Sequence, residues 1–215
     1  MHFVWYGQSC FKIIAKEATI IVDPFDRAIT GLEPPRSRAD AVLYTHKHSD
    51  HAAEYKQADF IISGPGEYEV KGVYFYGFPV PHDAVGGAVL GFSTAFLIEG
   101  DDLRVLHLGD FGAKQLTSEQ IEEIGDVDIL LVPIGGTYTL DAEGAEKMVR
   151  QIEPKVVIPM HYALPKLKMK LDSVDAFLRE MGVEKKTPLP KYVIKKKELP
   201  PEGTEVVILE SATGE

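Results

Sequence analysis

The 215-residue sequence predicts an α/β fold in which β-sheets are sandwiched between helical layers. Short strand patterns, rich in β-branched and aromatic residues, dominate the first half of the chain. In the second half, strand patterns alternate with helical ones. No internal repeat, low-complexity tract or linker rich in Pro, Gly or Ser interrupts the chain, so we expect residues 1–215 to form a single domain.

The strand patterns of the first half are separated by short turns. The segment Gly100-Asp101-Asp102 has the composition of a tight hairpin turn between the last two of these strands. The expected strands cover residues 3–6, 10–15, 18–23, 41–45, 60–63, 68–80, 93–100 and 103–109.

Three helices are expected in the second half. The first, over 117–125, opens with a capping box; the second, over 140–154, is capped by Asp141 and stopped by Pro154; the third covers 173–182. A further short helix is expected in the first half, in "HAAEYKQA" from His51 onward. The strands expected among and after these helices cover residues 127–135, 155–162, 191–196 and 205–210.

The composition excludes several classes of protein. No apolar run approaches the roughly 18 residues of a membrane helix, and the N-terminus lacks the pattern of a signal peptide. Cys10 is the only cysteine, which excludes an internal disulfide and a cysteine-rich zinc module. We therefore expect a cytoplasmic protein with no membrane partner. The net charge of −10 argues against nucleic-acid binding. The Lys-rich segment after Lys166 carries no motif, and the sequence does not indicate an oligomeric state.

The segment "THKHSDH", residues 45–51, follows an apolar strand and holds three of the seven histidines. In layered α/β folds, ligand sites gather at the carboxyl ends of strands. His46 and His48 are two residues apart, so in extended backbone their rings point to the same side. Asp50 and His51 follow on the turn. Imidazole and carboxylate groups suit Zn²⁺, Fe or Mn, so this segment predicts a metal site.

This segment alone cannot complete a two-metal site, because each metal needs three or more protein ligands and an open position. His82, His107 and His161 all lie near the ends of apolar strands. Asp110 also ends a strand, where its carboxylate could bridge two cations. On the residues alone, either His82 or His107 could complete the first metal site.

The motifs "THKHSDH", "HD…GG", "HLGDFG" and "PMHY", in this order, resemble the metallo-β-lactamase superfamily of metal-dependent hydrolases. "GQSCFKI", "IIVDPF", "SGPGEYEV" and "DVDILLVPIGG" resemble, more narrowly, a small branch related to the ascorbate-6-phosphate lactonases. The resemblance extends to about Ala163 and implies a four-layer αββα sandwich.

The resemblance also implies ligand roles. It favours His82 over His107 as the third ligand of the first metal, and His107 would then support the ligands or pack in a strand. It also suggests that Asp23 holds the loop of residues 45–51, called the histidine loop below, by hydrogen bonds. The implied ligands are His46, His48 and His82 for the first metal, Asp50, His51 and His161 for the second, and Asp110 between them.

The resulting hypothesis is a metal-dependent hydrolase that binds two Zn²⁺ ions per chain, with Mn²⁺, Fe or Ni²⁺ as alternatives. A water between the two ions would act as hydroxide, and Asp50 would orient it or shuttle its proton. The expected substrate is an ester, lactone or phosphodiester of a small metabolite, either phosphorylated or lactone-containing. The alternatives are a di-iron redox protein and a non-catalytic metal-binding module of the same fold.

Overall fold

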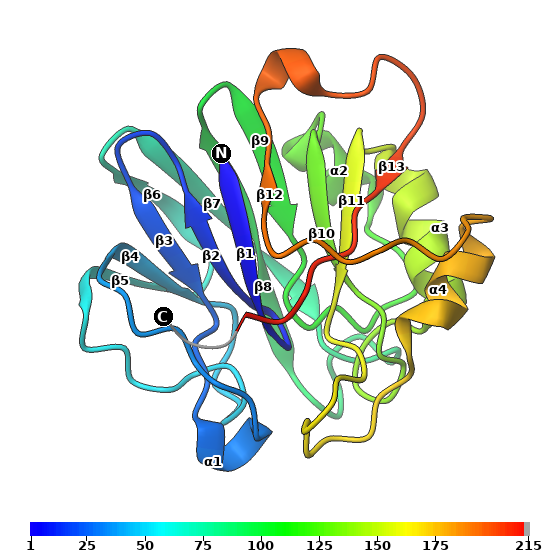
Figure 1. Ribbon diagram of the computed structural model, residues 1–215, viewed down its shortest axis with the longest axis horizontal. Coiled ribbons are helices and arrows are strands. Elements are labelled where there is room, and N and C mark those ends of the chain that lie inside the picture. Colours follow the sequence, from blue (N-terminus) through cyan, green and yellow to red (C-terminus); the bar gives the residue numbers. More distant parts are fainter. Residues whose placement is uncertain (213–215) are drawn as a thin grey trace.

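The computed structural model describes residues 1–212, which form two β-sheets packed face to face (Figure 1). The six-stranded sheet has the order β12-β1-β2-β3-β4-β5, and the seven-stranded sheet has the order β13-β11-β10-β9-β8-β7-β6. The first sheet comprises β1 (His2–Gly7), β2 (Cys10–Ile14), β3 (Thr19–Val22), β4 (Ala39–Tyr44), β5 (Ala58–Ser63) and β12 (Tyr192–Val193). The second comprises β6 (Gly66–Val70), β7 (Val73–Pro81), β8 (Phe92–Gly100), β9 (Leu103–His107), β10 (Ile129–Pro133), β11 (Val156–Met160) and β13 (Glu205–Val206).

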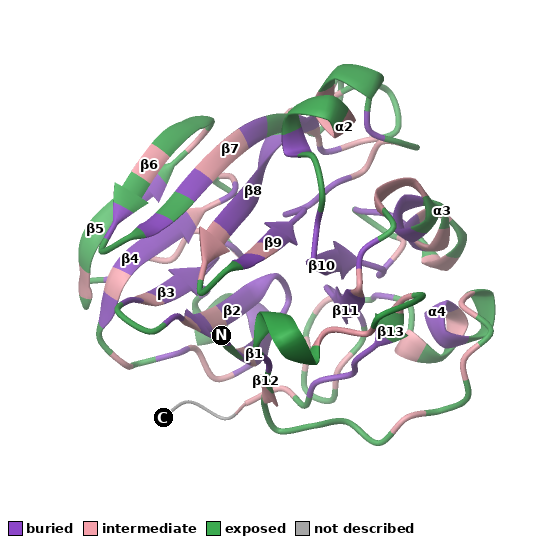
Figure 2. Ribbon diagram, turned by 90° about the horizontal axis from the view of Figure 1, so that it is seen from above, coloured by how far each residue is buried: buried purple, intermediate pink, exposed green. Residues whose placement is uncertain are grey.

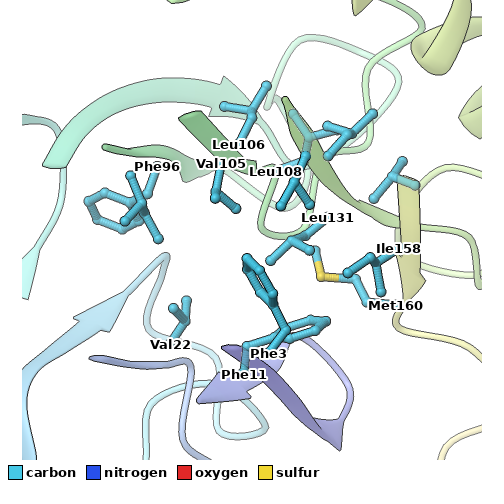
Figure 3. Packing of buried hydrophobic residues seen from close by; sticks show 14 of the residues in the cluster. Phe3, Phe11, Val22, Phe96, Val105, Leu106, Leu108, Leu131, Ile158 and Met160 are labelled. Carbon is cyan, nitrogen blue, oxygen red and sulfur yellow. The ribbon is translucent and has the colours of Figure 1, made fainter. Parts of the chain in front are cut away.

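The main hydrophobic core lies between the two sheets. Side chains of Phe3, Phe11 and Val22 from the first sheet face Phe96 and Leu131 from the second (Figure 3). The central parallel strands β10 and β11 are buried along their whole length, as expected for strands covered on both faces. Figure 2 shows the contrast with β5 and β6, which form one edge of each sheet and carry most of the exposed strand positions.

Helices cover the outer face of the seven-stranded sheet more fully than that of its partner (Figure 1). Helix α3 buries Met148 and α4 buries Phe177 in the main core. The outer face of the first sheet is covered by short segments instead: Phe25 packs near Cys10, and Tyr55 packs near Ile21. The helices are α1 (Arg27–Thr30), α2 (Ser118–Ile124), α3 (Ala142–Ile152), α4 (Val174–Glu180) and the 3₁₀ turn η1 (Lys196–Glu198). The predicted α/β sandwich is confirmed, with a thinner outer layer on the first sheet.

The prediction of a helix from His51 onward is wrong. Residues 52–55 have no regular structure, because tertiary contacts occupy their polar groups. Ala53 N donates to Pro24 O, the Tyr44 hydroxyl donates to Ala53 O, and the Tyr55 hydroxyl donates to Ser37 O. These bonds hold the segment against β3 and β4 and replace the local bonds of a helix.

The expected strand over 68–80 is two strands. The chain turns at Lys71-Gly72, where both residues have positive φ (51° and 74°), and β6 pairs antiparallel with β7. A turn of this kind matches the twist of a two-residue hairpin. The hairpin expected at Gly100–Asp102 is confirmed, with positive φ at Asp101 and Asp102.

Loops from both sheets meet at one edge of the molecule. Strands β3 and β4 run parallel, as do β9, β10 and β11. Strand β7 is antiparallel to β8, which is antiparallel to β9, so β7 and β9 run in the same direction. By the same argument β1 runs in the direction of β3. The carboxyl ends of these strands therefore deliver their loops to a shared edge.

Among residues 1–212, no helix is long and apolar enough to cross a membrane.

Candidate metal centre

The histidine loop that follows β4 is anchored by Asp23 at the end of β3. The wholly buried Asp23 carboxylate accepts hydrogen bonds from the backbone N–H of Thr45 (2.8 Å) and from its hydroxyl (2.7 Å). Its Oδ2 also lies 3.2 Å from Nδ1 of His51. Asp23 itself has a φ of +46°, a backbone conformation uncommon outside glycine. The expectation that Asp23 holds this loop by hydrogen bonds is confirmed.

The loop contributes to two neighbouring groups of candidate ligands. In each group, one donor atom from every residue lies within 4.8 Å of the others. A third such group joins Asp23 with His46 and His51, but the Asp23 oxygens already accept the hydrogen bonds described above. The two remaining groups are His46, His48 and His82, and Asp50, His51 and His161.

Asp110, which follows β9, lies between the two groups. Its side chain is 3% exposed, and Oδ1 accepts a hydrogen bond from the Ser9 hydroxyl at 3.1 Å. Its Oδ2 is turned toward four imidazoles and lies 3.3 Å from Nε2 of His51, 3.5 Å from Nε2 of His82 and of His161, and 3.9 Å from Nε2 of His46. This oxygen therefore faces histidines of both groups at once.

The donor set fits metal ions because several of its buried nitrogens have no hydrogen-bond partner. Nε2 of His46 and Nε2 of His51 are both buried without one, while Nδ1 of each ring faces Thr45 or Asp23. Nε2 of His82 lies only 3.2 Å from Nδ1 of His48. Buried polar atoms are rarely left unpaired, and neutral imidazole and carboxylate groups are the ligands that zinc and iron use. The arrangement therefore fits a metal centre.

His107 points away from this centre. Its Nε2 donates to the carbonyl of Ser9 at 2.9 Å, and its Nδ1 accepts from the N–H of Gly109 at 3.1 Å. Both ring nitrogens are thus used by the backbone, and burial lowers the pKa of the imidazole, which keeps it neutral. The structure brings His82, not His107, beside His46 and His48.

The electrostatics of the cluster favour a cation at its middle. Burial opposes the negative charge of Asp110, but His161 and His51 lower the pKa of its carboxyl well below the ordinary value. Burial also opposes a positive charge on His51, but Asp110 raises the pKa of that imidazole. At His46, burial and the neighbouring His51 lower the pKa to about 4, so this ring is neutral at pH 7. The neutral ring of His46 is in the form that binds metal, and the raised pKa of His51 reflects the negative charge of the carboxylates around it.

The turn between β1 and β2 holds two site residues that were not predicted. Gln8 is wholly buried, and its side-chain Nε2 donates to Asp50 Oδ2 at 3.2 Å. Its backbone carbonyl accepts from the backbone N–H of His161 at 3.0 Å. Ser9 contacts Asp110, as described above. The turn thereby positions one residue of the second group and the central carboxylate. In the sequence its signals are the Gly7 turn before a strand and the segment "GQSCFKI", which carries part of the family resemblance but assigns no role to either residue.

Two glycines allow the ligand-bearing backbones to approach. A Cβ at Gly112 would lie 2.4 Å from the carbonyl oxygen of His82, and a Cβ at Gly135 would lie 2.2 Å from that of His161. Both distances are too short for a Cβ atom next to a backbone oxygen, so a side chain at either position would clash. Glycine is therefore required at both positions to seat these two histidines.

Comparison with known sequences decides the family. The profile of the beta-lactamase superfamily domain matches residues 2–161, about three quarters of the chain. The chain belongs to the metallo-β-lactamase superfamily. A UPF0173 metal-dependent hydrolase of Thermoplasma acidophilum is 30% identical to it over 189 residues, which cover 75% of this chain and 83% of that protein. This relative and the cluster of His and Asp side chains together identify the chain as a metal-dependent hydrolase of the metallo-β-lactamase fold.

Solved structures agree with this assignment. A Thermotoga maritima protein, provisionally described as a Zn-dependent hydrolase of the metallo-β-lactamase superfamily, has 34% identity and a TM-score of 0.79, and the match covers 100% of this chain and 99% of that one. The di-iron β-hydroxylase CmlA of Streptomyces venezuelae shares the fold at 14% identity and a TM-score of 0.64, and the match covers 53% of its chain. The narrower resemblance to ascorbate-6-phosphate lactonases stays a prediction.

Proposed function

We propose that this superfamily member hydrolyses an ester, lactone or phosphodiester bond of a small metabolite at a centre of two zinc ions. The observation that carries the proposal is the position of Asp110, whose Oδ2 faces histidines of both candidate groups at once. His46, His48 and His82 would hold the first ion, Asp50, His51 and His161 the second, and Asp110 would contact both. These seven residues are the ligands that the resemblance to the superfamily implies.

When bound, two such ions supply Lewis acidity and lower the pKa of a water from about 15.7 toward about 7. The protein's own residues then position the reactants. Asp23 holds His51 in the orientation that leaves Nε2 free. The Asp50 side chain is 13% exposed, lines the cavity over the centre and is itself held by Gln8. Asp50 is therefore the group placed to orient a water molecule or accept its proton.

Metal content and turnover test this proposal together. The protein is purified without chelator, its metals are counted by mass spectrometry, and stripped protein is reloaded with zinc, manganese or iron. Each form is assayed with p-nitrophenyl acetate, an aliphatic lactone and bis(p-nitrophenyl) phosphate. Asp110→Asn serves as a matched variant, because it keeps the shape of the side chain and removes the charge between the two groups. The proposal expects two zinc ions per chain, turnover of one substrate class, and loss of most of that turnover in Asp110→Asn.

A fully loaded protein that turns over none of the three substrates would contradict hydrolysis and favour a non-catalytic module. Native iron with a visible absorption band would instead favour redox chemistry. The likeness to CmlA extends to the fold alone, and the match covers only 53% of its chain.

A further inference from the structure

The cavity over the metal centre is small and lacks basic side chains. Its volume is about 260 Å³, below the roughly 300–1,000 Å³ of typical ligand pockets. Five of the candidate ligands line it, and Leu90, Tyr138 and Met169 are among the other lining residues. No lysine or arginine is among the described residues that line it, although Lys47, Lys168 and Lys170 are adjacent to lining residues in the sequence; Lys168 instead donates to the carbonyl of Ala28. A phosphate group remote from the metals would find no cationic partner here.

Exposed hydrophobic side chains are concentrated in the loop that contributes Leu90 to the wall of this cavity. Of the eleven large hydrophobic side chains that are exposed among residues 1–212, four fall within residues 85–92. Val85 is 62% exposed, Val89 76% and Phe92 62%, and the fourth is the wall residue Leu90. Single exposed hydrophobic residues need no explanation, but a cluster beside a site does.

Hydrogen bonds hold this loop together. The carboxylate of Asp83 accepts hydrogen bonds from the backbone N–H groups of Val85, Gly87, Val89 and Leu90, at 2.7–3.0 Å. The loop begins directly after His82, whose N–H donates to Gly91 O across its base. These bonds fix the backbone of a loop that starts at one candidate ligand and contributes Leu90 to the cavity wall.

We propose that residues 85–92 and Tyr138 form an apolar subsite for the acyl chain of an uncharged aliphatic ester or lactone. The inference rests on the proposed function and narrows its substrate class away from phosphorylated metabolites. Hydrolysis breaks the acyl C–O bond, joins the acyl carbon to the oxygen of water, and passes a proton from that water to the departing alcohol oxygen. The reaction needs no further reactant.

Binding of a homologous series tests the subsite without turnover. Aceto-, butyro-, hexano- and octanohydroxamate share a metal-binding head and differ in chain length. Their affinity for the zinc-loaded protein is measured by titration calorimetry. Burial of each methylene should raise the affinity about three- to fourfold until the chain outgrows the subsite.

The double variant Val89→Ser/Phe92→Ser should reduce the ratio of octano- to acetohydroxamate affinity by at least about tenfold. Both side chains are exposed, so its melting temperature should match that of the native protein. The control is Phe60→Ser/Ile61→Ser on the edge strand β5, where the side chains are 56% and 69% exposed and do not line the cavity. This control should keep the native ratio.

Three outcomes would overturn the subsite: a flat chain-length series, zinc-loaded protein that binds no hydroxamate, or tighter binding of hexanohydroxamate that carries a terminal phosphonate. A parallel series of p-nitrophenyl esters separates the two proposals. Chain-dependent binding without hydrolysis of any ester would refute the proposed function and leave the subsite standing. Hydrolysis that is independent of chain length would refute the subsite alone.

Discussion

The carboxylate of Asp23 lies 3.2 Å from Nδ1 of His51, and both side chains are wholly buried. A charged carboxylate accepts the Nδ1 proton of a neutral imidazole and thereby fixes the tautomer whose Nε2 carries a lone pair. That Nε2 is buried beside Asp50 and Asp110 and has no hydrogen-bond partner. Asp23 therefore fixes the tautomer and orientation in which His51 would bind a metal, without itself being one of the proposed ligands.

Asp23→Asn should weaken metal binding at the second group. The amide would present an N–H to Nδ1 of His51 and favour the tautomer with its proton on Nε2, where it opposes a metal. We expect an affinity about 10–100-fold lower, measured by competition with a chelator of known strength. Asp59→Asn, at a partly exposed carboxylate on β5, is the control and should match the native protein. Native affinity in Asp23→Asn would contradict the role given to Asp23.

His82 and His107 should behave differently when each is replaced by alanine. His82→Ala should lose the metal of the first group, since the His82 ring faces His48 and Asp110. His107→Ala should keep both metals but lose about 1–3 kcal/mol of unfolding free energy, because the Ser9 carbonyl and the Gly109 N–H lose their buried partner. Metal counting and denaturant unfolding check the pair. The reverse pattern of metal loss would show that His107 is the ligand.

Gln8→Leu should reduce metal affinity more than stability. The change removes the hydrogen bond to Asp50 but keeps the side-chain volume. Since Oε1 of Gln8 is buried without a partner, loss of the amide should change the unfolding free energy by less than about 1 kcal/mol. Affinity at the second group should fall roughly tenfold. The exposed Gln115→Leu is the control, and a loss of stability with unchanged metal binding would assign Gln8 a purely structural role.

Gly135→Ala should displace His161. The new methyl group would press on the carbonyl oxygen of His161 at 2.2 Å, and neither backbone can yield without moving the ring. We expect loss of the second metal and destabilisation of about 1–3 kcal/mol. Gly144→Ala in helix α3 is the control. The new methyl group would meet only side-chain atoms, at 3.1 Å or more, and alanine has a higher helix propensity than glycine. If Gly135→Ala bound metal normally, this account of the glycine would be wrong.

The sequence predicts much of this site because its members follow apolar strands that run in the same direction within each sheet. The residues alone do not separate His82 from His107, because both follow apolar strands, and only the family resemblance favours His82. The partner that distinguishes them, the carbonyl of Ser9, lies 98 residues from His107 in the chain. Gln8 is missed for a similar reason: a lone amide in a turn has no local signature, and its partner Asp50 is 42 residues away.

Local patterns are misleading where tertiary bonds replace them. The segment after His51 has helix-forming residues, yet the hydrogen bonds of Ala53 and Tyr55 to neighbouring segments hold it in an irregular conformation. Helix α3 is predicted well, because its cap by Asp141 is local, and the side chain of that residue accepts from the N–H of Gly144.

A two-metal centre in which Asp50 would contact the second ion alone predicts a specific loss in Asp50→Ala, which metal counting measures. The variant should fold, retain one zinc ion per chain where the native protein holds two, and lose hydrolytic turnover. Lys47→Ala, at an exposed position of the same loop, should retain two ions and native turnover. An Asp50→Ala protein with both ions and full activity would contradict the account.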